Sequence, residues 1–362
     1  ENDVQTIPPI NGLFDSAGYD AVFISHYHLD HMGLAESIHP EIPVYMGDKA
    51  LDIVRASLRY KNEPFEDRYK PFSAGTKLVI GSTEITPLLV DHSAFDSYMF
   101  LLESGGKKVL YTGDFRANGR KSFAVLLSSL PKKVDTLICE GTTLSRQDKK
   151  NISEDDIERT AAELFKQKPG PVFILQSAMN IDRVVTMYRA AKRSSRMFLQ
   201  DLYMAEVTAA AGRTIPNPHC FTDVRVFITR PYPKEHPRYQ TFAGYGAKRI
   251  GIGQIGNQRF VMCVRTSMGN YLTSLSKKIN FANGLLVYSM WEGYKAKPEM
   301  QNFLGLCRSL GLEIMTLHTS GHADASTIET LVKRVNPTAI IPVHTENAAW
   351  FKERFDCIKV DC

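Results

Sequence analysis

The residues best suited to chemistry form one short run, His26-Tyr-His28-Leu-Asp30-His31, directly after the strand-like segment Asp20–Ser25. Side chains of an extended chain alternate between faces, so His26 and His28 point to the same side at the strand's end. Asp30 and His31 open an expected helix over 32–36, and the turn brings them against this pair. Imidazole and carboxylate together suit zinc, with manganese or iron as alternatives. The run predicts half of a dinuclear metal site; an accidental polar turn is the other interpretation.

Three further polar residues lie where buried-looking strand segments end. His92 follows residues 86–91, Asp114 follows 109–113 and His344 follows 339–343. Either histidine taken alone is more typical of a structural role, but together with the first run they would complete a site for two cations. Two adjacent divalent metals can share a water molecule and lower its pKa toward 7, which gives a hydroxide nucleophile at neutral pH.

The elements that must position these residues fall into two patterns. β-Branched and aromatic runs closed by Gly, Asp or Ser predict strands and few helices in the first part of the chain, over 20–25, 83–90, 98–103, 107–112 and 135–140. A helix with a capping-box-like start begins at Ser153, and strands then alternate with helices. A Pro- and Gly-rich stretch over 215–257 is expected to be irregular. The alternation predicts a doubly wound sheet packed against the strand-rich unit.

Composition sets the broad class. The chain has 362 residues, 43% hydrophobic and 23% charged, and no run approaches the roughly 18 apolar residues of a membrane span. The acidic, polar start Glu1-Asn2-Asp3 is not a signal peptide, so we expect a soluble, cytoplasmic protein without membrane contact. Six cysteines without a C-x-x-C pattern favour reduced thiols over a disulfide framework.

Residues 221–280 are strongly basic, although the net charge of the whole chain is only +5. The segment holds ten Lys and Arg against Asp223 and Glu235, and five aromatic residues are interleaved with them: Phe227, Tyr232, Tyr239, Phe242 and Tyr245. A polyanion with stackable bases fits this pattern. A solvated basic face over core aromatics fits it equally well.

Six motifs, taken in order, carry a family resemblance: SHYHLDH, DHSAFDS, TGDF, CEGTT, TSGHAD and PVHTE. They resemble those of the β-CASP branch of metallo-β-lactamase-fold nucleases, which includes RNase J-like and polyadenylation-endonuclease-like enzymes. The resemblance implies a metallo-β-lactamase αββα sandwich with an inserted doubly wound β-CASP domain. The lactamase-like domain would comprise 1–150 and 312–362, and the insertion 151–311. Only 25 residues precede His26, so we expect the opening strands of the first part to be missing.

The resemblance also assigns roles. His26, His28 and His92 would hold one divalent metal, Asp30, His31 and His344 the other, and Asp114 would bridge the two. Zn²⁺ is the expected metal and Mn²⁺ the alternative. Histidine in the last motif, here His344, is typical of RNA-processing members of the branch. The implied substrate is therefore single-stranded RNA, with DNA as the alternative.

The expected catalytic residues are Asp30, Glu140 and His322. In this hypothesis His322, in the loop Ser320-Gly321-His322, protonates the departing sugar oxygen while Glu140 orients and charges it. A loop histidine without a role and a carboxylate satisfied by backbone amides are the alternatives. Four residues are expected to contact substrate: Asn180, Arg183, Ser289 and Ser320. Asn180 and Arg183 lie near a predicted helix N-terminus, which favours phosphate groups.

Two other functions use the same residues. A small-molecule hydrolase would need the metals but would leave the insertion, the basic segment and the SGHAD loop without a role. A catalytically inactive RNA-binding scaffold would be expected to have lost ligands, and every expected ligand is present. The sequence leaves open whether cleavage is internal or from an end, and whether the chain forms a homo-oligomer.

Overall fold

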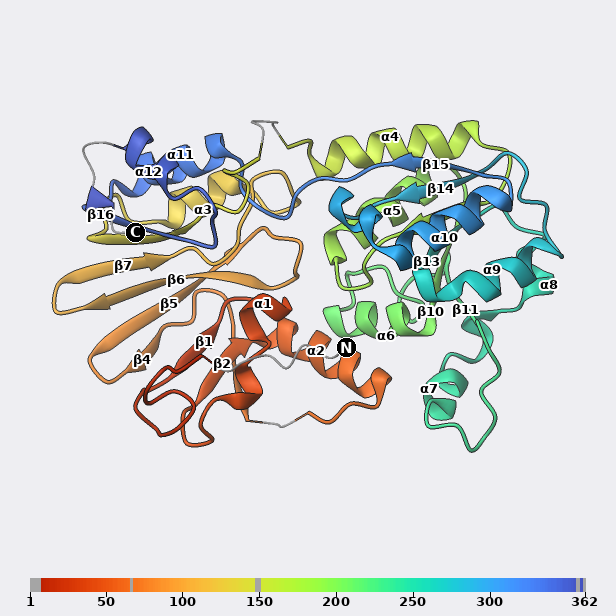
Figure 1. The fold of residues 1–362 in the computed structure, drawn as a ribbon. Helices are drawn as coiled ribbons and strands as arrows, with labels where there is room; N and C mark the ends of the chain where they lie inside the picture. The colour runs from red at the N-terminus through yellow and green to blue at the C-terminus, as the bar shows by residue number, and fades with distance from the viewer. Residues whose placement is uncertain (1–7, 66–67, 147–150, 356–358, 361–362) are drawn as a thin grey trace. The chain divides into compact units, whose positions relative to one another are not determined.

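A computed structural model describes residues 8–65, 68–146, 151–355 and 359–360. The chain divides into two compact units, which are described separately (Figure 1). Unit 1 comprises Glu1–Val54, Pro64–Lys150 and Gly321–Cys362, and unit 2 comprises Arg55–Glu63 and Asn151–Ser320.

Unit 1 contains two sheets. The larger has the order β17-β16-β8-β7-β6-β5-β4. Its strands are β4 (Leu78–Ile80), β5 (Thr83–Val90), β6 (Ser97–Ser104), β7 (Lys107–Tyr111), β8 (Thr136–Glu140), β16 (Ala339–Val343) and β17 (Lys359–Val360). Strands β4 to β7 pair antiparallel, whereas β7, β8, β16 and β17 pair parallel. The smaller sheet is parallel and contains β1 (Val22–Ile24), β2 (Val44–Gly47) and β3 (Tyr69–Phe72).

Aromatic side chains join the inner faces of these two sheets. The ring centroid of Phe23 lies 5.5 Å from that of Phe100, and Phe72 lies 4.9 Å from Tyr98. The opposite face of the larger sheet packs against α3 (Phe123–Ser129), α11 (Ala325–Val335) and α12 (Ala349–Arg354). The smaller sheet is accompanied by α1 (Leu29–Met32), the 3₁₀ turn η1 (Ala35–Ser37) and α2 (Asp48–Lys61). This arrangement confirms the predicted αββα sandwich.

Unit 2 is built on a parallel sheet of order β12-β11-β10-β13-β9-β14-β15. Its strands are β9 (Val172–Leu175), β10 (Met197–Asp201), β11 (Val224–Phe227), β12 (Arg249–Ile250), β13 (Phe260–Val264), β14 (Gly284–Tyr288) and β15 (Leu312–Thr316). The remaining elements are α4 (Glu154–Gln167), α5 (Ile181–Arg193), α6 (Leu202–Ala211), α7 (Tyr239–Gly244), α8 (Ile252–Ile255), α9 (Gly269–Ser276), α10 (Pro298–Ser309) and the 3₁₀ turns η2 (Gly246–Lys248), η3 (Thr266–Met268) and η4 (Glu292–Ala296).

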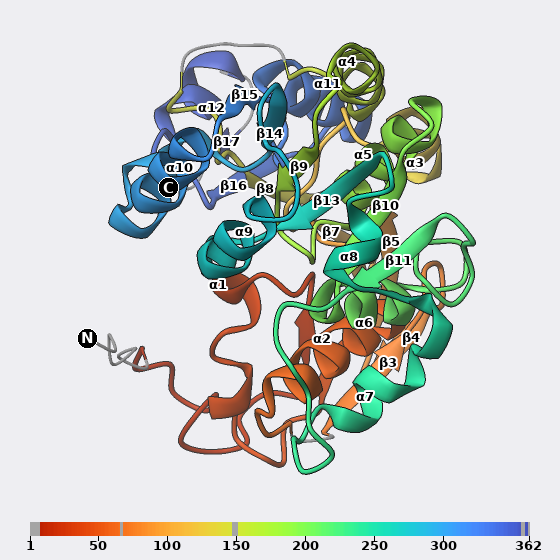
Figure 2. The same ribbon diagram turned by 90° about the vertical axis from the view of Figure 1, so that its right-hand side faces the viewer.

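Helices cover both faces of this sheet, as Figure 2 shows. Leu199 and neighbouring strand residues pack with Leu272 of α9 and Phe303 of α10 in one core cluster. The preceding residue, Phe198, points to the other face and contacts Tyr188 of α5, with ring centroids 5.8 Å apart. The predicted doubly wound sheet is therefore confirmed.

Some local expectations differ from the structure. The stretch 215–257, expected to be irregular, contains β11, α7, β12 and α8, and the 14-residue helix α2 lies where few helices were expected. The opening strands were expected to be missing, and residues 8–21 indeed form no strand. Residues 1–7 lie outside the described residues.

The four cysteines that are described, Cys139, Cys220, Cys263 and Cys307, are free thiols, while Cys357 and Cys362 lie outside the described residues. Among the helices that the structure describes, none has both the length and the apolar character that crossing a bilayer requires.

Candidate metal centre

Strand ends of unit 1 carry the candidate residues. His26 comes shortly after β1, His92 after β5, Asp114 after β7 and His344 after β16, while Glu140 is the last residue of β8. The turn before Asp114 requires glycine, because Gly113 has a φ of +52° and an added Cβ would lie 2.8 Å from the Tyr98 carbonyl oxygen. The structure brings all seven predicted ligands together in unit 1.

The first group consists of three imidazoles. The Nδ1 atom of His28 lies 3.2 Å from Nε2 of His26 and 3.1 Å from Nε2 of His92. His92 donates from Nδ1 to the Gly321 carbonyl oxygen at 2.6 Å, which leaves its Nε2 lone pair directed into the group. Burial lowers the pKa of His28 to about 4, and it also holds the pKa values of His26 and His92 well below the ordinary range. Three neutral imidazoles therefore converge, as metal binding requires.

The second group contains Asp30, His31, Asp114 and His344. His344 Nε2 lies 3.1 Å from Asp30 Oδ2, and His31 Nε2 lies 3.2 Å from Asp114 Oδ2. Asp114 faces both groups, since its Oδ2 is also 3.6 Å from Nε2 of His26. Its place between the two sets of ligands is the one expected of a bridging carboxylate.

Asp114 provides the test of whether cations fit here. Both of its carboxylate oxygens are buried without a hydrogen-bond partner, as is Nε2 of His31. Burial alone would raise the pKa of Asp114, but the imidazoles of His31, His322 and His26 hold it well below its usual range. A buried carboxylate is costly unless it is paired or coordinates a metal. The orphaned oxygens and converging nitrogens fit zinc, which binds His nitrogen and carboxylate oxygen.

A buried carboxylate and a histidine lie beside these groups. Glu140 is fully buried, and its Oε2 lies 3.1 Å from Nδ1 of His322. Its Oε1 accepts a hydrogen bond from the backbone NH of Phe115 at 2.8 Å. Burial lowers the pKa of the His322 imidazole, but the negative charges of Glu140 and Asp114 outweigh this and raise it above the ordinary value. The Glu140 carboxylate therefore favours the protonated form of His322.

Thr142 was not expected from the sequence to take part. Its Oγ1 donates to Glu140 Oε2 at 2.7 Å and lies 2.7 Å from Nδ1 of His344. If the hydroxyl hydrogen points to Glu140, Nδ1 of His344 donates to Thr142, and Nε2 of His344 keeps its lone pair for a metal. The signal was its place in the CEGTT motif, two residues after Glu140.

The four expected substrate contacts all belong to unit 2. Asn180 caps α5, since its side-chain oxygen accepts from the backbone NH of Arg183 at 3.1 Å. Arg183 is fully buried, forms a 2.9 Å ion pair with Glu154 and donates to Ser289 Oγ. Its guanidinium thus contacts protein atoms in this structure, and the expected contact with substrate phosphates stays a prediction. Ser289 is buried as well, and Ser320 is partly exposed two residues before His322.

The basic segment differs in part from expectation. Phe227, Tyr232 and Tyr245 are buried in core clusters, so their rings are not available to stack on bases. Arg249 covers the Phe242 ring with its guanidinium 4.0 Å from the ring centroid, and Arg230 lies 5.6 Å from that of Tyr232. We call residues 228–250 the basic arm. Arg230 and Lys234 in this arm are exposed, whereas Arg238 is half-buried and donates to the Tyr60 carbonyl oxygen.

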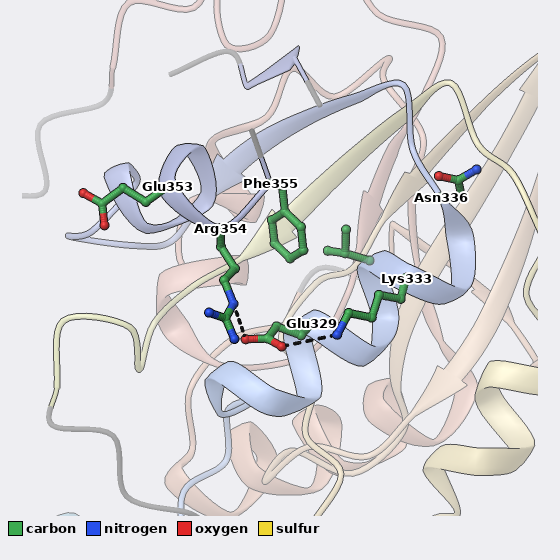
Figure 3. A pocket seen from close by; sticks show the side chains of 7 residues that line it. Glu329, Lys333, Asn336, Glu353, Arg354 and Phe355 are labelled. Carbon is green, nitrogen blue, oxygen red and sulfur yellow. Dashed lines mark hydrogen bonds and ion pairs between the residues drawn. The ribbon is translucent and has the colours of Figure 1, made fainter. Parts of the chain in front are cut away.

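A hollow of about 430 Å³ lies elsewhere in unit 1, beside α11 and α12 (Figure 3). Its lining residues are Glu329, Val332, Lys333, Asn336, Glu353, Arg354 and Phe355. Glu329 pairs with Arg354 at 2.7 Å and with Lys333 at 3.5 Å. None of the predicted site residues lines it.

Comparisons with known proteins agree with this geometry. Residues 4–176 match the β-lactamase superfamily domain, and residues 310–361 match the RNA specificity domain of Zn-dependent metallo-hydrolases. The chain is 23% identical to ribonuclease J of Sinorhizobium meliloti over 344 residues, which cover 91% of this chain and 58% of that protein. It is 22% identical to ribonuclease J of Helicobacter pylori over 353 residues, covering 90% and 47%.

The chain therefore spans between about half and three fifths of the length of these relatives. Among solved structures, a protein of unknown function from Enterococcus faecalis has a similar fold. The two structures superpose with a TM-score of 0.73, and their sequences are 20% identical. The superposition covers 94% of this chain and 82% of that chain.

Proposed function

We propose that this chain, which has the metallo-β-lactamase fold and resembles the β-CASP ribonucleases, hydrolyses phosphodiester bonds in single-stranded RNA. The observation that carries the proposal is the convergence of three imidazoles and of an Asp30–His31–Asp114–His344 group around the buried carboxylate of Asp114. The match of residues 310–361 to an RNA specificity domain supports RNA as the substrate. The inserted domain, 151–311, would supply the surface along which RNA lies.

Two divalent metals, Zn²⁺ or Mn²⁺, would be held by the two groups, with Asp114 contributing to both. When bound, such ions make a nucleophilic water available at neutral pH and offset charge that develops at the phosphate. The chain's own residues prepare for this binding. Gly321 fixes the ring of His92, burial keeps His26, His28 and His92 neutral, and Thr142 orients His344.

His322 is the proposed general acid, and Glu140 the residue that orients and charges it. The 3.1 Å contact with Glu140 engages Nδ1 of His322, so Nε2 is the nitrogen that would give its proton to the departing sugar oxygen. The His322 side chain is 21% exposed, so it can meet a substrate, whereas Glu140 is enclosed.

Replacing the acid tests this role directly. His322→Ala is expected to bind zinc normally but to lose about 10²–10⁴-fold in kcat on RNA, the usual range for general acid catalysis. Metal content per protein and single-turnover rates measure the two effects. A variant with full metal content and full turnover would remove His322 from the mechanism.

The decisive experiment offers end-labelled single-stranded RNA and DNA, with and without a 5′ phosphate, to the protein supplied with zinc or manganese. We expect cleavage of RNA only when metal is added, and none by Asp114→Asn. Mononucleotide products would indicate an exonuclease, and longer fragments an endonuclease. Binding without cleavage would favour an inactive scaffold, and turnover of small esters alone a small-molecule hydrolase.

A further inference from the structure

A buried ion pair joins two residues that lie next to candidate ligands in the sequence. Asp91 and Arg116 are 3% and 1% exposed, and Arg116 Nε donates to Asp91 Oδ1 at 2.5 Å. Asp91 immediately precedes His92 of the first group, and Arg116 follows Asp114 by two residues. The backbone joins the same positions, because the NH of Arg116 donates to the Asp91 carbonyl oxygen at 2.8 Å.

The strand order explains why such a link is needed. Strands β5 and β7, which lead into His92 and Asp114, are not neighbours, since β6 lies between them and pairs with both. Hydrogen bonds between paired strands therefore do not connect the C-terminal ends of β5 and β7, which lead to His92 and Asp114. The backbone hydrogen bond between Arg116 and Asp91 and the ion pair between their side chains connect the two segments instead.

The loop after Asp114 is shaped around the carboxylate. Asp91 Oδ2 accepts a hydrogen bond from the backbone NH of Lys121 at 2.6 Å. Gly119 approaches so closely that an added Cβ would lie 1.8 Å from Asp91 Oδ1, so only glycine fits. On its other side the loop is held by the hydrogen bond from Phe115 NH to Glu140. These contacts hold the segment that directly follows Asp114.

Stability alone does not account for this pair. Two charges in the interior lose their hydration, and well-packed apolar residues of similar size often stabilise a protein equally well. Apolar side chains could not form the directional hydrogen bond that fixes the distance between the backbone segments at Asp91 and Arg116. Groups that orient metal ligands in this way typically change metal affinity 10- to 100-fold when they are replaced.

We propose that Asp91 and Arg116 are positioning residues, which hold His92 and Asp114 at the separation that the metal ions require. The inference rests on the ligand roles in the proposed function, but it concerns metal affinity instead of RNA cleavage. It assigns a shared task to the first residue of the DHSAFDS motif and the residue that directly follows the TGDF motif.

The test measures zinc affinity by competition with a chromophoric chelator, below the unfolding temperature of each variant. Asp91→Asn keeps the shape of the side chain and removes its charge, and we expect zinc binding to weaken 10- to 100-fold. Arg116→Lys keeps the charge but loses the planar donor, and we expect a smaller loss. This milder variant decides the question if Asp91→Asn does not fold.

Glu154→Gln is the matched control. It also removes a buried carboxylate from an arginine pair, but in unit 2, where no proposed ligand lies. We expect it to lower stability and to leave zinc affinity unchanged. If folded Asp91→Asn or Arg116→Lys binds zinc as tightly as the unmodified chain, the pair is merely structural and the proposal is overturned. An unmodified chain that binds no zinc would instead contradict the proposed metal centre.

Discussion

At the scale of single residues, the Glu140–His322 pair predicts a pH dependence. A general acid works only while protonated, so the rate falls as the pH rises through the pKa of His322. Burial alone lowers this pKa, and the charge of Glu140 contributes to raising it above the ordinary value. Glu140→Gln should therefore move the alkaline limb of the kcat profile to lower pH.

The measurement is a pH profile of single-turnover cleavage at saturating metal. Asp135→Asn provides a control, because this partly exposed carboxylate, just before β8, pairs with Lys107 at the start of β7 and not with a site residue. An alkaline limb that stays in place in Glu140→Gln would show that Glu140 does not set the protonation of His322.

The sequence predicts these residues unequally well. The spacing of His26, His28, Asp30 and His31 is a local signal, because strand and helix geometry dictate where such side chains point. Thr142 and the Asp91–Arg116 pair were not predicted, since their partners are remote in the chain and no spacing rule relates them. Arg183 illustrates the opposite case, because its place near a helix start gave no sign that Glu154 would bury it. The metal-binding roles themselves stay predictions.

At the scale of elements, the capping box of α4 predicts a stability effect. Ser153 Oγ accepts from the Asp156 NH at 3.0 Å, and Asp156 Oδ2 accepts from the Ser153 NH at 3.2 Å. Ser153→Ala should cost about 1 kcal/mol. For a unit of this size, that lowers the unfolding midpoint by about 2–4 °C.

Differential scanning calorimetry measures the shift. Ser309→Ala serves as the control, because this exposed serine in the last turn of α10 bonds only within its own helix and caps no N-terminus. Equal midpoints for the two variants would mean that the box does not stabilise α4.

Many of the strands and helices were predicted because their patterns are local, whereas β2, β3, β4 and α3, among others, were not. The exceptions have physical causes. The short strand β11 gains its stability from parallel pairing with β10, which the sequence does not display. The sequence of α2 does indicate a helix, since Leu51, Val54 and Leu58 recur at helical spacing. The helix was missed because the segments around it favour strands.

At the scale of the whole molecule, the basic arm predicts how RNA binding responds to salt. Arg230 and Lys234 are exposed and Arg249 partly so. If each meets one phosphate, Arg230→Gln/Lys234→Gln/Arg249→Gln should lower the slope of log affinity against log salt by about 2, since a single-strand contact contributes roughly 0.7.

Filter binding of metal-free protein to single-stranded RNA over a salt series measures the slope. The matched control removes three unit 1 lysines that already pair with acidic neighbours, Lys77, Lys107 and Lys108. Identical slopes for the arm variant and the unmodified chain would exclude the arm from RNA contact.

Metal removal should destabilise the chain. Ions that bind only the folded state stabilise it by about 2.7 kcal/mol when present at 100 times their Kd. Chelation is therefore expected to lower the unfolding midpoint of the unmodified chain, and added zinc should restore it. A midpoint that does not respond to zinc would argue against a bound ion at Asp114.

The distribution of the ligands along the chain has a consequence for biosynthesis. His26, His28, His92 and Asp114 leave the ribosome early, but His344 follows only after the whole of unit 2. At roughly 20 residues per second, more than about ten seconds pass between the synthesis of Asp114 and that of His344, and during this time the set of metal ligands is incomplete. A product whose translation stops within unit 2 would lack His322 and His344, so a truncated copy could not acquire the full centre.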